Sequence, residues 1–126
     1  MAEFIFLDFA VIEELHQISL EMYGGSPGIR DKGLIESAIA SGRNAFSYGG
    51  GDLFDVAAAY AFHLAQAQAF LDGNKRTGAG AALLFLRANG VTQLPPDDEL
   101  YSALIAIAER RLDKTGLATL FRKAAV

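Results

Sequence analysis

Phe70-Leu71-Asp72-Gly73-Asn74-Lys75-Arg76-Thr77 separates the two most regular apolar segments of this chain. Before it, residues 53 to about 70 are apolar nearly all round, which predicts a helix at the centre of a bundle. After it, helical apolar spacing runs from about residue 75 to residue 88, where Asn89-Gly90 predicts a left-handed helix end. We therefore expect the octapeptide to be a tight junction between two central helices.

Helical spacing also extends outward on both sides of this pair. The predicted helix starts lie at Asp8, Asp31, Asp52 and Pro95-Pro96, and a last short helix carries Leu117, Leu120 and Phe121. The helix after Asp31 is predicted to end at about Ala40. Residues 41–51, which include three consecutive glycines, predict a flexible loop or short hairpin. At most a little β structure is expected, in that loop or near residues 4–7. The pattern indicates an all-α bundle of about six helices, with residues 1–126 forming a single domain.

Composition excludes several classes of protein. A length of 126 residues suits one domain with one core. The absence of cysteine excludes disulfides and thiolate sites and fits a reducing cytoplasm. A net charge of −4 argues against nucleic acid as a partner, and the basic residues near the C-terminus are read as a solvated helix face. The apolar runs are too short for a signal peptide or a membrane span, so no membrane role is expected.

The charge at the junction is the feature that predicts a function. A helix start carries roughly half a positive charge, so Lys75 and Arg76 in the first turn are unfavourable there unless an anion binds. Gly73 permits a positive φ and lets a phosphate oxygen approach the backbone. Arg76 offers a planar fork of donors and Lys75 a mobile charge, while Asp72 could hold Mg²⁺ against the phosphates. The junction therefore predicts a seat for nucleotide phosphate.

Each of these residues also has a purely structural interpretation. Asp72 could be only the N-cap of the following helix, and Gly73-Asn74 could be only a turn. Lys75 and Arg76 could point into solvent. On local sequence alone the tetrapeptide does not decide between these alternatives.

Three separate stretches carry a family resemblance. They are the octapeptide, residues 23–31 with their continuation over 33–38, and Leu83-Leu84-Phe85-Leu86-Arg87-Ala88-Asn89-Gly90. Together they resemble the Fic/Doc family, most closely its Doc (death-on-curing) toxin branch, from about Ile5 to Leu120. The resemblance implies a Fic-type helical bundle in which residues 41–51 form the flap that lays target backbone beside it as an added strand.

The resemblance also implies an activity and its partners. It implies a toxin paired with an antitoxin protein, which uses ATP and Mg²⁺ to move a phosphate-containing group onto a protein hydroxyl. Most Fic enzymes transfer AMP, but the Doc branch transfers phosphate to a threonine of elongation factor Tu, and the likeness to that branch favours phosphate here. By position, Asp72 would be the Mg²⁺ ligand and Gly73 part of the anion hole. Asn74 would bind phosphate or orient the substrate, and Lys75 and Arg76 would grip the nucleotide phosphates.

Two positions depart from the general Fic pattern. Ala79 stands where that pattern has a second arginine, as in the Doc branch, which favours a Doc-like phosphate arrangement over AMP transfer. Gln68 stands where the family has its catalytic histidine, and glutamine has no titratable group to act as a general base. Loss of such a base typically costs about 100- to 10,000-fold in rate.

The two histidines of the chain are not expected to replace that base. His63 lies five residues before Gln68 and would face another direction on the same helix, and His16 lies in the first helix. We interpret both as packed side chains. The sequence thus leaves open an impaired Doc-like transferase or, as the alternative, a catalytically inactive Fic-fold module that binds nucleotide and antitoxin. A helical interaction module without a nucleotide site is a third hypothesis.

Overall fold

The structure, a computed structural model, describes residues 4–126. This part of the chain holds six α-helices: α1 Phe9–Tyr23, α2 Lys32–Ser47, α3 Leu53–Ala67, α4 Asn74–Ala88, α5 Asp97–Ala108 and α6 Lys114–Ala124. Within residues 4–126 no β-strand forms, and β pairing is limited to one isolated bridge between Ile29 and Phe70. The predicted all-α fold class is therefore confirmed.

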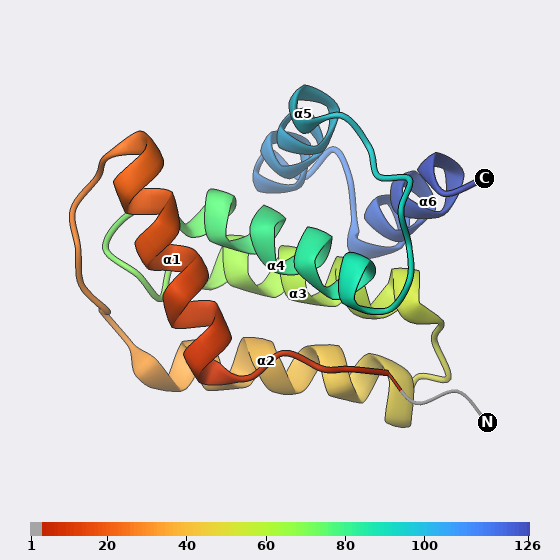
Figure 1. The fold of residues 1–126 in the computed structure, drawn as a ribbon, viewed down its shortest axis with the longest axis horizontal. Coiled ribbons are helices and arrows are strands. Elements are labelled where there is room, and N and C mark those ends of the chain that lie inside the picture. The colour runs from red at the N-terminus through yellow and green to blue at the C-terminus, as the bar shows by residue number, and fades with distance from the viewer. Residues whose placement is uncertain (1–3) are drawn as a thin grey trace.

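The two central helices lie side by side in the bundle (Figure 1). α3 packs against α2, α4 and α6, while α1 and α5 contact α4. α3 is the most buried element, with eight buried residues that include Tyr60 and Leu64. α4 contributes Phe85 and Leu86 to the same core. The junction between α3 and α4 therefore lies at one end of the core, where α1 and α5 also approach α4.

Aspartate N-caps begin four of the six helices. The side chains of Asp8, Asp31, Asp52 and Asp113 each accept a hydrogen bond from a backbone N–H in the first turn that follows. Such a bond satisfies one of the amides that a helix start leaves without an intrahelical partner. The helix starts predicted at Asp8, Asp31 and Asp52 are confirmed, as is the one after Pro95-Pro96.

The prediction of a loop or hairpin over residues 41–51 is wrong for most of that segment, because α2 continues to Ser47. Gly42 is buried where α2 crosses α3, and a Cβ at this position would lie 2.6 Å from the Tyr60 ring. Close packing of the two helices thus requires the glycine that local propensity treats as a helix breaker. The flap predicted from the family resemblance is not a strand here, and only residues 48–52 connect the two helices.

The extended N-terminal segment forms no strand. The Ile5 N–H donates to Asn89 Oδ1 (2.7 Å) and the Leu7 N–H donates to Tyr60 Oη (3.1 Å), so side chains take the place of a strand partner. Among residues 4–126 no helix has both the length and the apolar character needed to cross a membrane.

Candidate functional site

The six residues between α3 and α4 bring the predicted site residues together. They border a cavity of about 160 Å³ lined by Gln68, Leu71, Asp72, Gly73, Asn74, Lys75, Arg76 and Tyr101. Every residue predicted for the site lies on this cavity. Tyr101, which comes from α5, was not predicted, because an exposed aromatic residue 25 positions after Arg76 carries no local signal of its contact with the loop.

The start of α4 lacks a side-chain cap. Its N-cap is Gly73, whose φ of 77° lies in the left-handed region, and no side chain accepts from the first-turn amides. The first turn contains no acid and two cations, Lys75 and Arg76. The arrangement combines open amides, the positive end of a helix dipole and two basic side chains, which together favour a bound anion.

Arg76 is held at the edge of the cavity by an aromatic contact. Its guanidinium carbon lies 4.6 Å from the centroid of the Tyr23 ring, and Tyr23 is the last residue of α1. A cation over a ring face is attracted by the ring's negative face. This contact limits the positions of the Arg76 side chain while leaving its donors exposed.

The side chain of Asn74 stabilises the loop between α3 and α4 through two hydrogen bonds. The side chain is buried; its Oδ1 accepts from the Phe70 N–H and its Nδ2 donates to the Phe70 carbonyl oxygen, both at 3.0 Å. These two bonds close a ring across the junction and fix the direction in which α4 begins. The side chain is thus occupied in shaping the loop, so contact of residue 74 with phosphate stays a prediction that the backbone N–H is best placed to fulfil.

Asp72 lies just outside the helix and is not its N-cap. Its Oδ1 accepts from the Gly73 N–H at 2.9 Å, and its Oδ2 accepts from the Ser26 N–H at 3.3 Å. The loop before α2 approaches so closely that a Cβ on Gly25 would lie 2.8 Å from Oδ2. The backbone around Asp72 is therefore shaped to hold a carboxylate in a fixed orientation.

The donor set around Asp72 fits a magnesium ion that is shared with a phosphate ligand. Across residues 4–126 no three His, Cys, Asp or Glu side chains cluster closely enough to hold a metal by themselves. Magnesium, however, commonly binds through one or two carboxylates plus substrate phosphate and water. Each Asp72 oxygen accepts one bond and keeps a second lone pair, so the carboxylate retains capacity for a cation.

His16 supports the loop from α1, a contact that the sequence did not predict. Its Nε2 lies 2.8 Å from the Asp72 carbonyl oxygen, and its ring stacks on Phe70 with 3.8 Å between centroids and 12° between planes. Only 5% of its surface is exposed. The expectation of a packed histidine is consistent with this burial, but the packing partner is the loop between α3 and α4, 56 residues away in sequence.

Gln68 occupies a left-handed position directly after α3. The prediction that α3 extends to about residue 70 is wrong, since the helix ends at Ala67 and Gln68 has a φ of 55°. Its carbonyl accepts from Arg30 Nε at 3.0 Å, and its side-chain Nε2 donates to the Ala65 carbonyl oxygen at 3.1 Å. The side chain is thus turned back onto the end of α3 while the residue still borders the cavity.

His63 lies elsewhere on α3. Its Nε2 is 3.0 Å from Lys114 Nζ, and burial, together with the charge of Lys114, lowers the pKa of His63. The residue does not line the cavity at the junction, so it is not placed to replace Gln68 as a base there.

Comparison with known proteins decides the family. The sequence profile of the Fic/DOC family matches residues 6–86. The chain belongs to the Fic/DOC family. It is 36% identical over 110 residues to the protein kinase doc of Escherichia phage P1, with 86% of each chain covered. It is 39% identical over 102 residues to the toxin Doc of Mycolicibacterium smegmatis, covering 76% of this chain and 77% of that protein.

Membership of the Fic/DOC family agrees with the six-helix architecture and gives the junction a context. The matched region contains α1 to α3, the whole junction and most of α4. Both relatives are named Doc, so the predicted likeness to the Doc branch is confirmed.

Proposed function

We propose that this chain is a Doc-like toxin of a toxin–antitoxin pair, which binds a nucleotide and transfers phosphate from it to a protein hydroxyl. The observation that carries this proposal is the uncapped, cation-bearing start of α4, whose first-turn amides face a cavity. The names of the two relatives, one a protein kinase and one a toxin, support it.

Different residues of the junction would bind different parts of a nucleotide such as ATP and its magnesium ion. The first amides of α4 and the side chains of Lys75 and Arg76 would hold phosphate oxygens, and Gly73 would leave the backbone open to them. Asp72 would hold Mg²⁺, which would supply neutralisation of phosphate charge. The side chains of His16 and Asn74 would keep the loop in place without touching the ligand.

The transfer step requires a general base, which the residue at position 68 does not provide. A target hydroxyl oxygen attacks the γ-phosphorus, the bond from that phosphorus to the β–γ bridging oxygen breaks, and the nucleoside diphosphate leaves. The hydroxyl proton must go to a base, and Gln68 can only donate or accept a hydrogen bond because its side chain does not titrate near neutral pH. Asp72 could accept the proton only if it were not engaged with magnesium. We infer that catalysis is impaired relative to a site with histidine at position 68.

Phosphate transfer is favoured over AMP transfer by the residue one turn after Arg76. Ala79 stands where the general Fic pattern has a second arginine, and an alanine cannot hold a further phosphate group. We propose a threonine of elongation factor Tu as the hydroxyl and an antitoxin protein as the regulatory partner, on the resemblance to the Doc branch.

The alternative is a catalytically inactive module that binds nucleotide and antitoxin. The bond from Gln68 Nε2 to the Ala65 carbonyl favours it, because this geometry commits the glutamine to the end of α3. A matched pair of proteins separates the two proposals, since only residue 68 distinguishes them.

The test incubates the chain and its Gln68→His variant with Mg²⁺, purified elongation factor Tu and ATP labelled in parallel at the α- or γ-phosphate. We expect γ-label to enter the target at least tenfold faster with the variant, because the imidazole restores a base. His63→Gln is the control, since that histidine does not line the cavity.

Three other outcomes would change the proposal. Equal transfer by the parent and Gln68→His would show that residue 68 does not limit the reaction. Entry of α-label would indicate AMP transfer. Binding of ATP without transfer by either protein would favour the inactive module.

A further inference from the structure

Arg30, in the loop between α1 and α2, holds the residue that directly follows α3. Its Nε donates to the Gln68 carbonyl oxygen at 3.0 Å, and its Nη2 donates to the same oxygen. Hydrogen bonds from a charged donor are roughly twice as strong as those between neutral groups. Within residues 4–126 this carbonyl accepts a hydrogen bond from no other group, so its position depends on the Arg30 side chain.

The backbone around Arg30 is itself fixed against the junction. The Arg30 and Asp31 N–H groups both donate to the Ala69 carbonyl oxygen, at 2.7 and 3.0 Å. The isolated β-bridge between Ile29 and Phe70 lies beside these bonds. The Arg30 side chain therefore starts from a fixed backbone and needs to order only its own rotamers to reach the carbonyl.

Gln68 has a backbone conformation that is unfavourable for residues other than glycine. Its φ of 55° and ψ of 39° lie in the left-handed region, where the Cβ of an L-residue crowds the following carbonyl oxygen. The bond from its Nε2 to the Ala65 carbonyl oxygen joins the side chain to α3 but leaves the Gln68 carbonyl free. Such a conformation persists only where the surrounding structure holds it, and the two bonds from Arg30 act directly on it.

Arg30 also supplies a charge that the end of α3 lacks. α3 has no basic residue in its last turn, although the C-terminal end of a helix carries roughly half a negative charge. The Arg30 guanidinium, bonded to the first carbonyl beyond the helix, brings a positive charge there from another part of the chain. The contact thus stabilises the conformation in which α3 ends at Ala67 and the chain turns into the junction.

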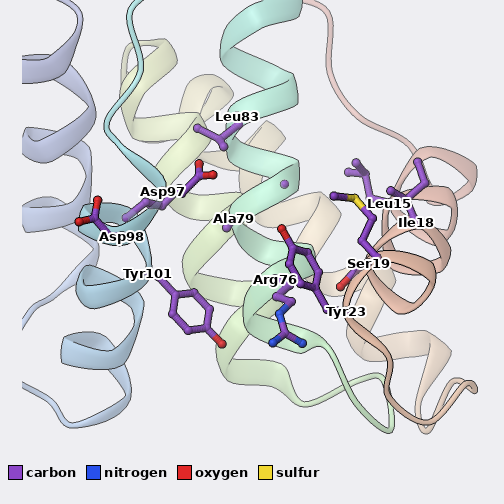
Figure 2. Close-up of a pocket in the computed structure, with 13 residues that line it drawn as sticks. Leu15, Ile18, Ser19, Tyr23, Arg76, Ala79, Leu83, Asp97, Asp98 and Tyr101 are labelled. Atoms are coloured by element: carbon purple, nitrogen blue, oxygen red, sulfur yellow. The ribbon is translucent and has the colours of Figure 1, made fainter.

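Arg30 lies outside the spaces that a ligand could occupy. It does not line the junction cavity, nor the groove of about 500 Å³ between α1, α4 and α5, which shares Arg76 and Tyr101 with that cavity (Figure 2). Gln68, by contrast, borders the junction cavity. Arg30 can therefore influence the cavity through residue 68, whose backbone conformation decides which rotamers its side chain adopts.

We propose that Arg30 is a positioning residue, which sets the direction of the side chain at position 68 by holding the carbonyl oxygen of that residue. This inference rests on the proposed function, because it assigns residue 68 a part in phosphate transfer. A histidine placed at position 68 then acts as a base only while Arg30 maintains the left-handed conformation.

The first test measures transfer of γ-label from ATP to elongation factor Tu by the Gln68→His protein and by three double variants, which add Arg30→Met, Arg30→Lys or Arg87→Met. Arg87 is the control, because it is exposed and forms no ion pair within residues 4–126. We expect Arg30→Met to lower kcat at least tenfold while the KM for Mg²⁺–ATP changes less than twofold. Arg30→Lys should recover at least threefold of that loss, because an ammonium group can donate to the same oxygen.

Three results of this assay would overturn the proposal. They are equal kcat values for the Arg30→Met and Arg87→Met proteins, a loss that appears in KM instead of kcat, and equal losses with methionine and lysine at position 30.

The second test does not depend on transfer. Backbone chemical shifts of residue 68 report its φ and ψ, and we expect left-handed values in the parent chain and in Arg87→Met but not in Arg30→Met. If residue 68 stays left-handed without Arg30, the positioning role is wrong, whether or not any of the proteins transfers phosphate. A parent chain that binds no Mg²⁺–ATP would overturn the proposed function instead, and the chemical shifts would still decide whether Arg30 holds residue 68.

Discussion

The two central helices begin in opposite ways, although each start leaves backbone N–H groups without an intrahelical partner. α3 begins with a complete capping box, in which Asp52 accepts from the Asp55 N–H and the Asp55 side chain accepts from the Asp52 N–H. Arg122 of α6 then pairs with both acids. α4 begins at Gly73 with no side-chain cap, and its first turn carries two cations instead of acids.

The difference is between a helix start whose amides are capped and one whose amides stay open. At α3 the chain satisfies its own amides and offsets the helix dipole with carboxylates, so nothing is left for a ligand. At α4 the same amides stay open, and the loop is held from outside by His16 and from behind by the bonds of Asn74 to Phe70. External support allows a helix start to remain uncapped and still have a fixed shape.

The largest expected effect comes from placing an acidic side chain at the start of α4, as the sequence does at the start of α3. Gly73→Asp places a carboxylate where the anion is expected, while Gly73→Asn adds a side chain of the same shape without charge. Both residues tolerate a positive φ, and a Cβ at position 73 would meet its nearest neighbours at an ordinary 3.6 Å. We expect Gly73→Asp to bind Mg²⁺–ATP at least tenfold more weakly than Gly73→Asn, as measured by titration calorimetry. Equal affinities of the two variants would mean that the α4 start does not hold the phosphates.

A smaller effect is expected from removing the external support of the loop. His16→Leu leaves the Asp72 carbonyl without its donor, which should lower the free energy of unfolding by about 1–3 kcal/mol. His16→Gln also loses the stacking on Phe70 but restores an N–H donor, so part of this stability and of the ATP affinity should return. Urea unfolding and ATP titration of both variants provide the measurement. If leucine and glutamine behave alike, the contribution of His16 is packing alone.

The smallest expected effect concerns the capped start of α3 and the pH dependence of the stability that it provides. Burial by itself would raise the pKa of Asp52, but the bonds from the Asp55 N–H and Arg122 outweigh it and lower the pKa below the ordinary 3.8. As the pH falls, Asp52 is therefore protonated in the unfolded chain before it is protonated in the folded chain. Its contribution to stability is present above about pH 4 and is lost as the pH falls through the lower folded-state pKa.

Asp52→Asn keeps a residue that can cap the helix but removes the charge. It should lower stability at pH 7 by about 0.2–1 kcal/mol, the range for exposed ion pairs, and this difference should shrink toward pH 3. Asp8→Asn is the matched control, because Asp8 also caps a helix but forms no ion pair within residues 4–126. A difference that does not change with pH would contradict the assigned role of the Arg122 pair.

Features that depend on neighbours in sequence could be predicted. The helix starts at Asp8, Asp31 and Asp52 follow from short-range hydrogen bonds between a side chain and the next turn, and the cation-rich α4 start follows from the order Gly73-Asn74-Lys75-Arg76. The predictions that failed are those in which long-range packing overrides local preference. Gly42 suggested a break, yet it is the residue that lets α2 approach Tyr60.

The sequence by itself determined the helical bundle, the position of the junction and the sign of the charge on the first turn of α4, because caps, apolar spacing and charge act over a few residues. The tertiary structure alone decided that His16 contacts the Asp72 carbonyl, that the Asn74 amide turns inward, and that Tyr101 joins the cavity. These contacts join elements far apart in the chain, and their geometry exists only once α1, α4 and α5 have packed together.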